Sequence, residues 1–191
     1  MKTLAILIFT ALTTFSSYAS VVEPITTTIE GKTITVFFDD DKSELVTISI
    51  VDKVGFELLE EEVQTKNRKS RSYNLKQLPL GTYTIKIEGD QKIVYKEIKT
   101  ERNGSVVVSE KTAFKPNSTF DNNRWKINLL SQGKNVDIKI LDANYETIFE
   151  DKIKDKMVLA KAYNLEELNN GVYTLSVRVG NEVYNKVIAK M

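Results

Sequence analysis

The side chains of this 191-residue chain that could do chemistry are its acids and bases, because it contains no histidine and no cysteine. Their absence excludes Ser-His-Asp and Cys-His nucleophilic arrangements, thiolate metal sites, and the side chain that ordinarily titrates near neutral pH. Hydrolysis by paired carboxylates needs two acids held in one concave site. The acids here lie mostly at expected turns and outward strand positions, and no glycine-rich phosphate loop is present. We therefore expect a protein that is not an enzyme and that uses no cofactor and no metal.

One acidic loop could supply oxygen ligands to calcium, because Asp39, Asp40 and Asp41 are followed closely by Glu44. The corresponding loop in the second half of the chain, around Gln132, contains no acid. A solvated hairpin loop explains the same four residues without a metal ion, and this is the interpretation that we favour.

A run of basic residues is the second candidate, since it could bind an acidic glycan or another anionic partner. It consists of Lys66, Arg68, Lys69 and Arg71. Glutamates at several positions between 57 and 62 precede this run across a turn, so antiparallel strand pairing would set acids opposite bases. We favour such cross-strand charge pairing over a binding patch, although each pair would contribute only about a few tenths of a kcal/mol.

The single tryptophan, Trp125, is the third candidate, because an exposed indole can serve as a platform for a ligand. Ile127 and Leu129 follow it at alternate positions and therefore share its strand face. This pattern favours a tryptophan buried in a core, or packed between two domains, over one that binds a ligand.

The elements that would position these residues occur twice, ninety residues apart. In each copy a glycine precedes a tyrosine by two residues, at Gly81 and Tyr83 and again at Gly171 and Tyr173. Apolar and polar residues then alternate, which is typical of a half-buried strand. We expect each glycine to supply a positive φ. Each tyrosine should bury its ring and donate its hydroxyl to backbone just upstream, as in the tyrosine corner of a β-sandwich.

The remaining runs also alternate with period two and are separated by Asp-, Asn- and Gly-rich turns, with no helical period. Six or seven short strands per copy predict an all-β fold of two tandem immunoglobulin-like antiparallel β-sandwiches. Residues 25–29 and 105–109 are candidates for extra strands, and the pair Asn103-Gly104 indicates a hairpin. Residues 111–119 would connect the two domains. Residues 164–170 could form one helical turn. The expected strands are 33–38, 45–51, 56–63, 71–75, 82–88 and 92–99 in the first copy, and 124–130, 136–141, 146–153, 158–163, 172–179 and 182–189 in the second.

Residues 1–19 have the features of a cleaved signal peptide: Lys2 precedes an apolar run, and Ser17-Tyr18-Ala19 is a small-x-small cleavage site. We predict domains at 20–111 and 112–191. Without the signal peptide the chain has 26 basic and 26 acidic residues, and such a balance does not favour nucleic acid or an anionic membrane. We also expect no transmembrane segment after cleavage.

The second copy combines an alternating run at 136–142, a corner and strand at 165–177, and a basic, apolar closing strand at 186–190. In these features it resembles the C-terminal sorting domains of type IX secretion cargo. The first copy shares part of this pattern, and the corner at 78–83 is also similar to that of fibronectin type III and immunoglobulin-like domains. The resemblance implies a compact β-sandwich that addresses its passenger to the outer-membrane translocon.

Two functions are consistent with these features. The first is an exported structural or binding module without enzymatic activity, located in the periplasm, on the outer surface or outside the cell. Its partner would be an unknown protein or glycan at the cell envelope. The second is a type IX secretion cargo whose second domain is the sorting domain. The sequence alone favours the first function narrowly, because the two copies share their corner, turns and closing strand.

Overall fold

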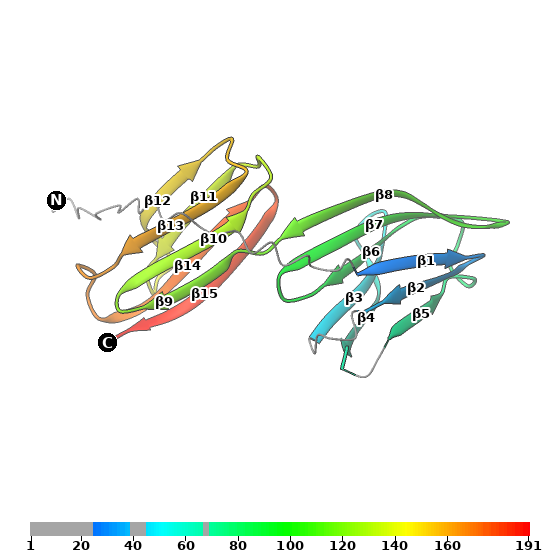
Figure 1. Ribbon diagram of the computed structural model, residues 1–191, viewed down its shortest axis with the longest axis horizontal. Helices are drawn as coiled ribbons and strands as arrows, with labels where there is room; N and C mark the ends of the chain where they lie inside the picture. Colours follow the sequence, from blue (N-terminus) through cyan, green and yellow to red (C-terminus); the bar gives the residue numbers. More distant parts are fainter. Residues whose placement is uncertain (1–24, 39–44, 67–68) are drawn as a thin grey trace. The chain divides into compact units, whose positions relative to one another are not determined.

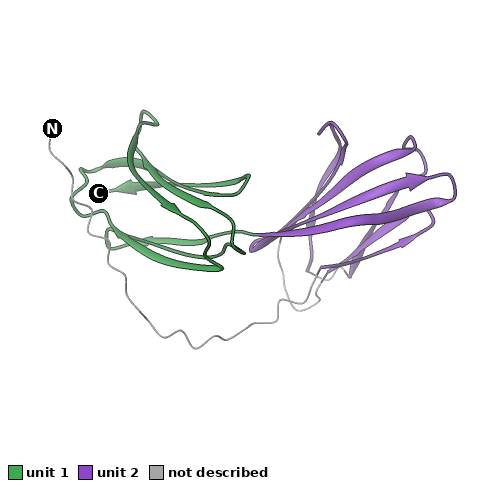
Figure 2. Ribbon diagram, turned by 90° about the horizontal axis from the view of Figure 1, so that it is seen from above, with its two compact units in different colours: residues 1–16, 114–191 green, residues 17–113 purple. Residues whose placement is uncertain are grey.

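The computed structural model describes residues 25–38, 45–66 and 69–191, which divide into two compact units at Ala113 and Phe114 (Figure 2). We call residues 25–113 the N-terminal unit and residues 114–191 the C-terminal unit. Each unit is a sandwich of two antiparallel sheets with its own hydrophobic core (Figure 1). The predicted fold class, two tandem immunoglobulin-like antiparallel β-sandwiches, is confirmed.

The N-terminal unit packs a three-stranded sheet, ordered β1-β2-β5, against a five-stranded sheet, ordered β4-β3-β6-β7-β8. Alternate residues of the strands point into the core, where Ile34, Ile48, Ile85 and Ile87 are fully buried. Burying such a side chain contributes about 1.5–3 kcal/mol. The strands are β1 (Thr26–Glu30), β2 (Thr33–Phe37), β3 (Leu45–Asp52), β4 (Glu57–Gln64), β5 (Ser70–Asn74), β6 (Gly81–Glu88), β7 (Lys92–Glu101) and β8 (Gly104–Phe114).

The C-terminal unit repeats this plan with a three-stranded sheet, ordered β9-β10-β13, and a four-stranded sheet, ordered β12-β11-β14-β15. Its core holds the fully buried Trp125, Ile127, Ile138 and Ile140. No strand equivalent to β8 is present among its residues. The strands are β9 (Asn117–Asp121), β10 (Arg124–Leu130), β11 (Val136–Leu141), β12 (Thr147–Ile153), β13 (Val158–Asn164), β14 (Gly171–Val179) and β15 (Glu182–Lys190).

The strands that the period-two pattern predicts are all present, with ends that differ by no more than two residues. The predicted connection at 111–119 is wrong, because β8 continues to Phe114 and β9 begins at Asn117. β9 pairs with β10 through a two-residue turn, in which Asn122 and Asn123 have φ of 49° and 56°. Asparagine tolerates such angles, so this turn forms without glycine.

Two further details differ from the expectations. Residues 164–170 form turns and no helix, with the Leu168 amide donating to the Leu165 carbonyl at 3.1 Å. The hairpin predicted at Asn103-Gly104 turns one residue earlier, so that Gly104 already begins β8. A Cβ at Gly104 would lie 3.2 Å from the carbonyl oxygen of Gly31, and this close approach explains the glycine.

The turn after β3 is repeated after β11 with one instructive substitution. Asp52 Oδ1 accepts the amides of Val54 and Phe56 at 2.9 and 2.8 Å. Asp142 Oδ1 accepts the amides of Asn144 and Glu146 in the same way, at 2.8 and 2.9 Å. The third residue after each aspartate has a positive φ, 87° at Gly55 and 62° at Tyr145. Tyr145 is 75% exposed, so no packing compensates for its left-handed backbone.

We therefore expect Tyr145→Gly to stabilise the C-terminal unit by about 1 kcal/mol, because glycine adopts this conformation without steric cost. Gly55→Tyr is the matched change in the N-terminal unit and should destabilise that unit by a similar amount. Urea unfolding followed by tryptophan fluorescence reports the C-terminal unit, which contains the single tryptophan. A lower unfolding midpoint for Tyr145→Gly would contradict this account of the turn.

Candidate functional site

The two tyrosine corners form as predicted. Tyr83 donates its hydroxyl to the Pro79 carbonyl at 2.8 Å, and Tyr173 donates its hydroxyl to the Asn169 carbonyl at 2.7 Å. Both rings are buried, with 6% and 8% of their surface exposed. These contacts fix the entry into β6 and β14, and they have a structural role.

The expectation that both corner glycines need a positive φ is wrong. Gly171 has no positive φ, and the φ of 159° at Gly81 is close to fully extended backbone. The reason is that each glycine is already the first residue of its strand, β6 or β14, and continues the extended chain.

A charged cluster joins the two sheets at one side of the N-terminal unit. Glu61 on β4 accepts hydrogen bonds from Arg71 Nε at 3.0 Å and from the Tyr73 hydroxyl at 3.2 Å. Its second oxygen lies 2.8 Å from an Arg71 Nη atom, so the guanidinium engages both carboxylate oxygens. Arg71 and Tyr73 lie on β5, which belongs to the other sheet.

The C-terminal unit repeats this cluster at positions ninety residues further on. Asp151 on β12 accepts hydrogen bonds from the Tyr163 hydroxyl at 2.7 Å and from Lys161 Nζ at 2.5 Å. The ring of Tyr163 is fully buried and packs against Trp125 and Phe149, with ring centroids 5.6 and 5.4 Å apart. We call these two groups the acid–base–tyrosine clusters.

The clusters hold their tyrosines in the neutral form. Burial raises the pKa of Tyr73 to about 12, and the charge of Glu61 adds to the effect. Burial raises the pKa of Tyr163 further, and the hydrogen bond to Asp151 acts in the same direction. Each acid is engaged by a base and a hydroxyl from the opposite sheet, so each cluster links the two sheets of its unit.

Alkaline pH should therefore destabilise the N-terminal unit. The folded state holds the Tyr73 proton more tightly than an ordinary tyrosine of pKa 10.0 does, so the stabilising contribution is complete below pH 10. It is lost as the pH rises from 10 toward about 12. Urea unfolding midpoints measured across this range by circular dichroism should fall less steeply in Tyr73→Phe. The exposed-tyrosine control, Tyr145→Phe, should follow the unmodified chain. Equal slopes in all three proteins would contradict the role of Tyr73.

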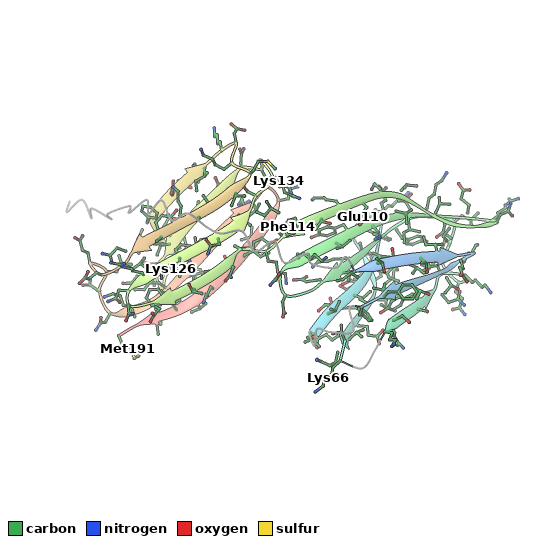
Figure 3. All side chains as sticks on the ribbon, in the orientation of Figure 1. Lys66, Glu110, Phe114, Lys126, Lys134 and Met191 are labelled. Carbon is green, nitrogen blue, oxygen red and sulfur yellow. The ribbon has the colours of Figure 1, made fainter. Side chains whose placement is uncertain are left out.

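The predicted basic patch is only partly visible. Arg71 is bound to Glu61. The side chain of Lys66, just after β4, is exposed (Figure 3), and so is that of Lys69, just before β5. Arg68 lies outside the described residues. The expectation that acids and bases face each other on paired strands is wrong, because β4 pairs with β3 and β5 pairs with β2. The ion pair crosses between sheets instead, and a binding role for the patch stays a prediction.

The calcium alternative falls on residues that the structure does not describe, namely Asp39, Asp40, Asp41 and Glu44. Elsewhere in the described ranges, no three acids, histidines or cysteines come together as metal ligands would. Within the same ranges, no helix is long and apolar enough to cross a membrane.

Trp125 lies in the core, as predicted, and is fully buried. Its indole Nε1 donates to the Ser118 hydroxyl of β9 at 2.6 Å. Because the whole ring is enclosed, Trp125 offers no platform for a ligand.

A polar hollow of about 360 Å³ lies at the β9–β10 turn, and sequence reasoning missed it. Several of its polar groups already pair with one another, as Asn122 Nδ2 does with Asp121 at 3.0 Å. The hollow lies between the β9–β10 turn and the end of β13. The pair Asn122-Asn123, which forms that turn, was the sequence feature that could have indicated the hollow. Its lining residues are Asp121, Asn122, Asn123, Arg124, Lys126, Asn164 and Glu166.

Three solved structures match this chain at low similarity. The biofilm associated protein BSP domain is 16% identical, with a TM-score of 0.26, and the match covers 85% of this chain and 28% of that chain. The chicken CNTN1 FN1–FN3 domains are 8% identical, with a TM-score of 0.27 and coverages of 85% and 66%. The two fibronectin type-III domain segment from chicken tenascin is 9% identical, with a TM-score of 0.29 and coverages of 87% and 99%.

This chain thus spans 28% and 66% of the first two of these structures. No curated protein matches the sequence significantly. The sequence family of secretion system C-terminal sorting domains matches twice, at residues 30–101 and 116–190. The first match runs from the end of β1 to the end of β7, and the second runs from the residue before β9 to the end of β15. Together the two matches cover most of both sandwiches, and the chain therefore belongs to the family of secretion system C-terminal sorting domains.

Proposed function

We propose that this chain is a type IX secretion cargo in which the C-terminal unit is the sorting domain. Membership of the family implies export to the cell envelope or exterior, and the family match over 116–190 carries the proposal. Residues 1–19 would be the signal peptide for the first export step. The domains would be 20–111 and 112–191. This function was the alternative in the sequence analysis, and the family match favours it over an ordinary binding module.

A difference between the two sandwiches supports the choice of the C-terminal unit. Both units match the family, so the family pattern alone does not select one of them. In the N-terminal unit β7 lies between β6 and β8, whereas its counterpart β15 has β14 as its single neighbour among the described strands. The closing strand of the C-terminal unit is therefore the one that a receptor could reach. The N-terminal unit would be the passenger, and we propose no catalytic role for either unit.

Removing residues 114–191 should keep the chain from the cell surface and the medium. The N-terminal unit has its own core, so the truncated chain should still fold and reach the periplasm. The matched control removes residues 25–113 and keeps the signal peptide and the C-terminal unit. Immunoblotting of periplasm, surface and medium from a host with the type IX system measures the outcome. Equal surface delivery of the chain that lacks 114–191 would contradict the proposal.

A further inference from the structure

The internal duplication supplies a template for what the open edge of the C-terminal unit can bind. β7 and β15 have the same register in their sheets, because Lys96 lies opposite Ile85 and Lys186 lies opposite Leu175. The two lysines are ninety residues apart. In the N-terminal unit the outer edge of β7 pairs with β8, whereas the equivalent edge of β15 has no strand beside it among the described residues. The β7–β8 pair therefore shows how a strand can bind to this edge.

The covered edge of β7 has a specific charge contact. Lys96 Nζ lies 2.8 Å from Glu110 Oε2, and Glu110 lies on β8 (Figure 3). Lys96 is only 7% exposed, whereas the side chain of Glu110 is 50% exposed, so a largely buried ammonium pairs with a carboxylate that is open to solvent. At the open edge, Lys186 is exposed and donates to the Ser118 carbonyl at 2.9 Å, with no carboxylate contact at that atom.

Apolar exposure shows the same difference between the two edges. Ile93 on β7 is 3% exposed, whereas Val183 at the matching position of β15 is 46% exposed. Val187, on the same strand face as Val183, is 67% exposed. An added strand would cover such side chains and would use the backbone groups that an edge strand leaves unpaired.

We propose that the outer edge of β15 binds an extended partner segment that resembles β8, with β-branched apolar residues followed by a carboxylate that pairs with Lys186. β8 has this composition, since Val106, Val107 and Val108 precede Glu110. A second copy of β15 (Glu182–Lys190) fits less well, because its one acid lies at the first position of the strand, away from Lys186. An antiparallel pair that sets the two Lys186 residues opposite each other would place like charges side by side. The strand site does not depend on whether the C-terminal unit is the sorting domain.

The probe for this site is a synthetic, capped peptide with the sequence of residues 104–114, added to the full chain. Backbone hydrogen exchange should slow along β15 when the peptide binds, and β7 should be unaffected because β8 already covers it. A peptide in which the position of Glu110 holds glutamine should bind about two- to fivefold more weakly, since an ion pair with a solvent-exposed carboxylate is lost. Lys186→Gln in the chain should weaken the normal peptide by a similar factor.

A charge exchange makes the test specific. Lys186→Glu should abolish binding of the normal peptide, and a peptide with lysine at the position of Glu110 should restore it. Lys152→Gln, on β12 at the other edge of the sheet, is the matched control and should leave binding unchanged. The proposal is overturned if the peptide fails to protect β15, if the charge exchange does not restore binding, or if β15 becomes protected at high chain concentration without peptide. The last result would identify a second copy as the occupant.

Discussion

Tyr173→Ala should destabilise the C-terminal unit by about 3–5 kcal/mol, which is the range for truncation of a large buried aromatic residue. The change removes a ring that is 8% exposed and leaves the Asn169 carbonyl without its hydroxyl donor. A loss of this size is a large part of the stability of a small domain, which is about 5–15 kcal/mol. Urea unfolding followed by the fluorescence of Trp125 reports the affected unit directly.

Three further variants separate the causes of this loss. Tyr173→Phe keeps the ring and removes one hydrogen bond, so it should cost only about 1 kcal/mol. Tyr83→Ala removes the matching ring of the N-terminal unit and should leave the tryptophan-detected transition in place. Tyr145→Phe changes an exposed tyrosine and should have no measurable effect. An unfolding midpoint unchanged by Tyr173→Ala would show that the corner does not support the sandwich.

The strands and both corners could be predicted from sequence because their causes are local. Alternation of apolar and polar residues sets the faces of a strand, and the corner tyrosine contacts a carbonyl only four residues upstream. β9 was missed because its pattern is short and its strand state depends on pairing with β10. The positive φ of Asn122 and Asn123 supplies the turn that a search for glycine overlooks.

Contacts between the two sheets could not be derived from the same patterns. The sequence indicated that the acids before residue 63 and the bases after 65 would meet, and Glu61 does bind Arg71. The prediction placed them on paired strands, whereas they lie on different sheets. Period-two alternation assigns a residue to a face and does not say which strand of the opposite sheet faces it. The third member of the cluster, Tyr73, was missed for this reason.

The unpaired edge of β15 could not be predicted from the sequence either. The closing strands of the two copies match in register, so the sequence makes them equivalent. They differ in their surroundings, since β8 covers one of them and is an addition to the repeated pattern. Of this difference, the sequence predicted only the extra strand at 105–109. Its length, and its contact through Glu110 with Lys96, became clear only in the folded unit.

The transfer of each sandwich to an unrelated reporter tests the sorting function most directly. Two fusions carry the same signal peptide and periplasmic reporter, followed either by residues 114–191 or by residues 25–113. Both units match the family, which makes the second fusion a control of similar fold and size. The measurement is the fraction of reporter on the surface and in the medium of a host with the type IX system. A host that lacks the translocon supplies the background.

The account predicts that the reporter carrying residues 114–191 leaves the periplasm only where the translocon is present, and that the reporter carrying residues 25–113 stays in the periplasm of both hosts. Retention of both reporters in the periplasm, with the C-terminal unit folded, would contradict the assignment of residues 114–191 as a sorting domain.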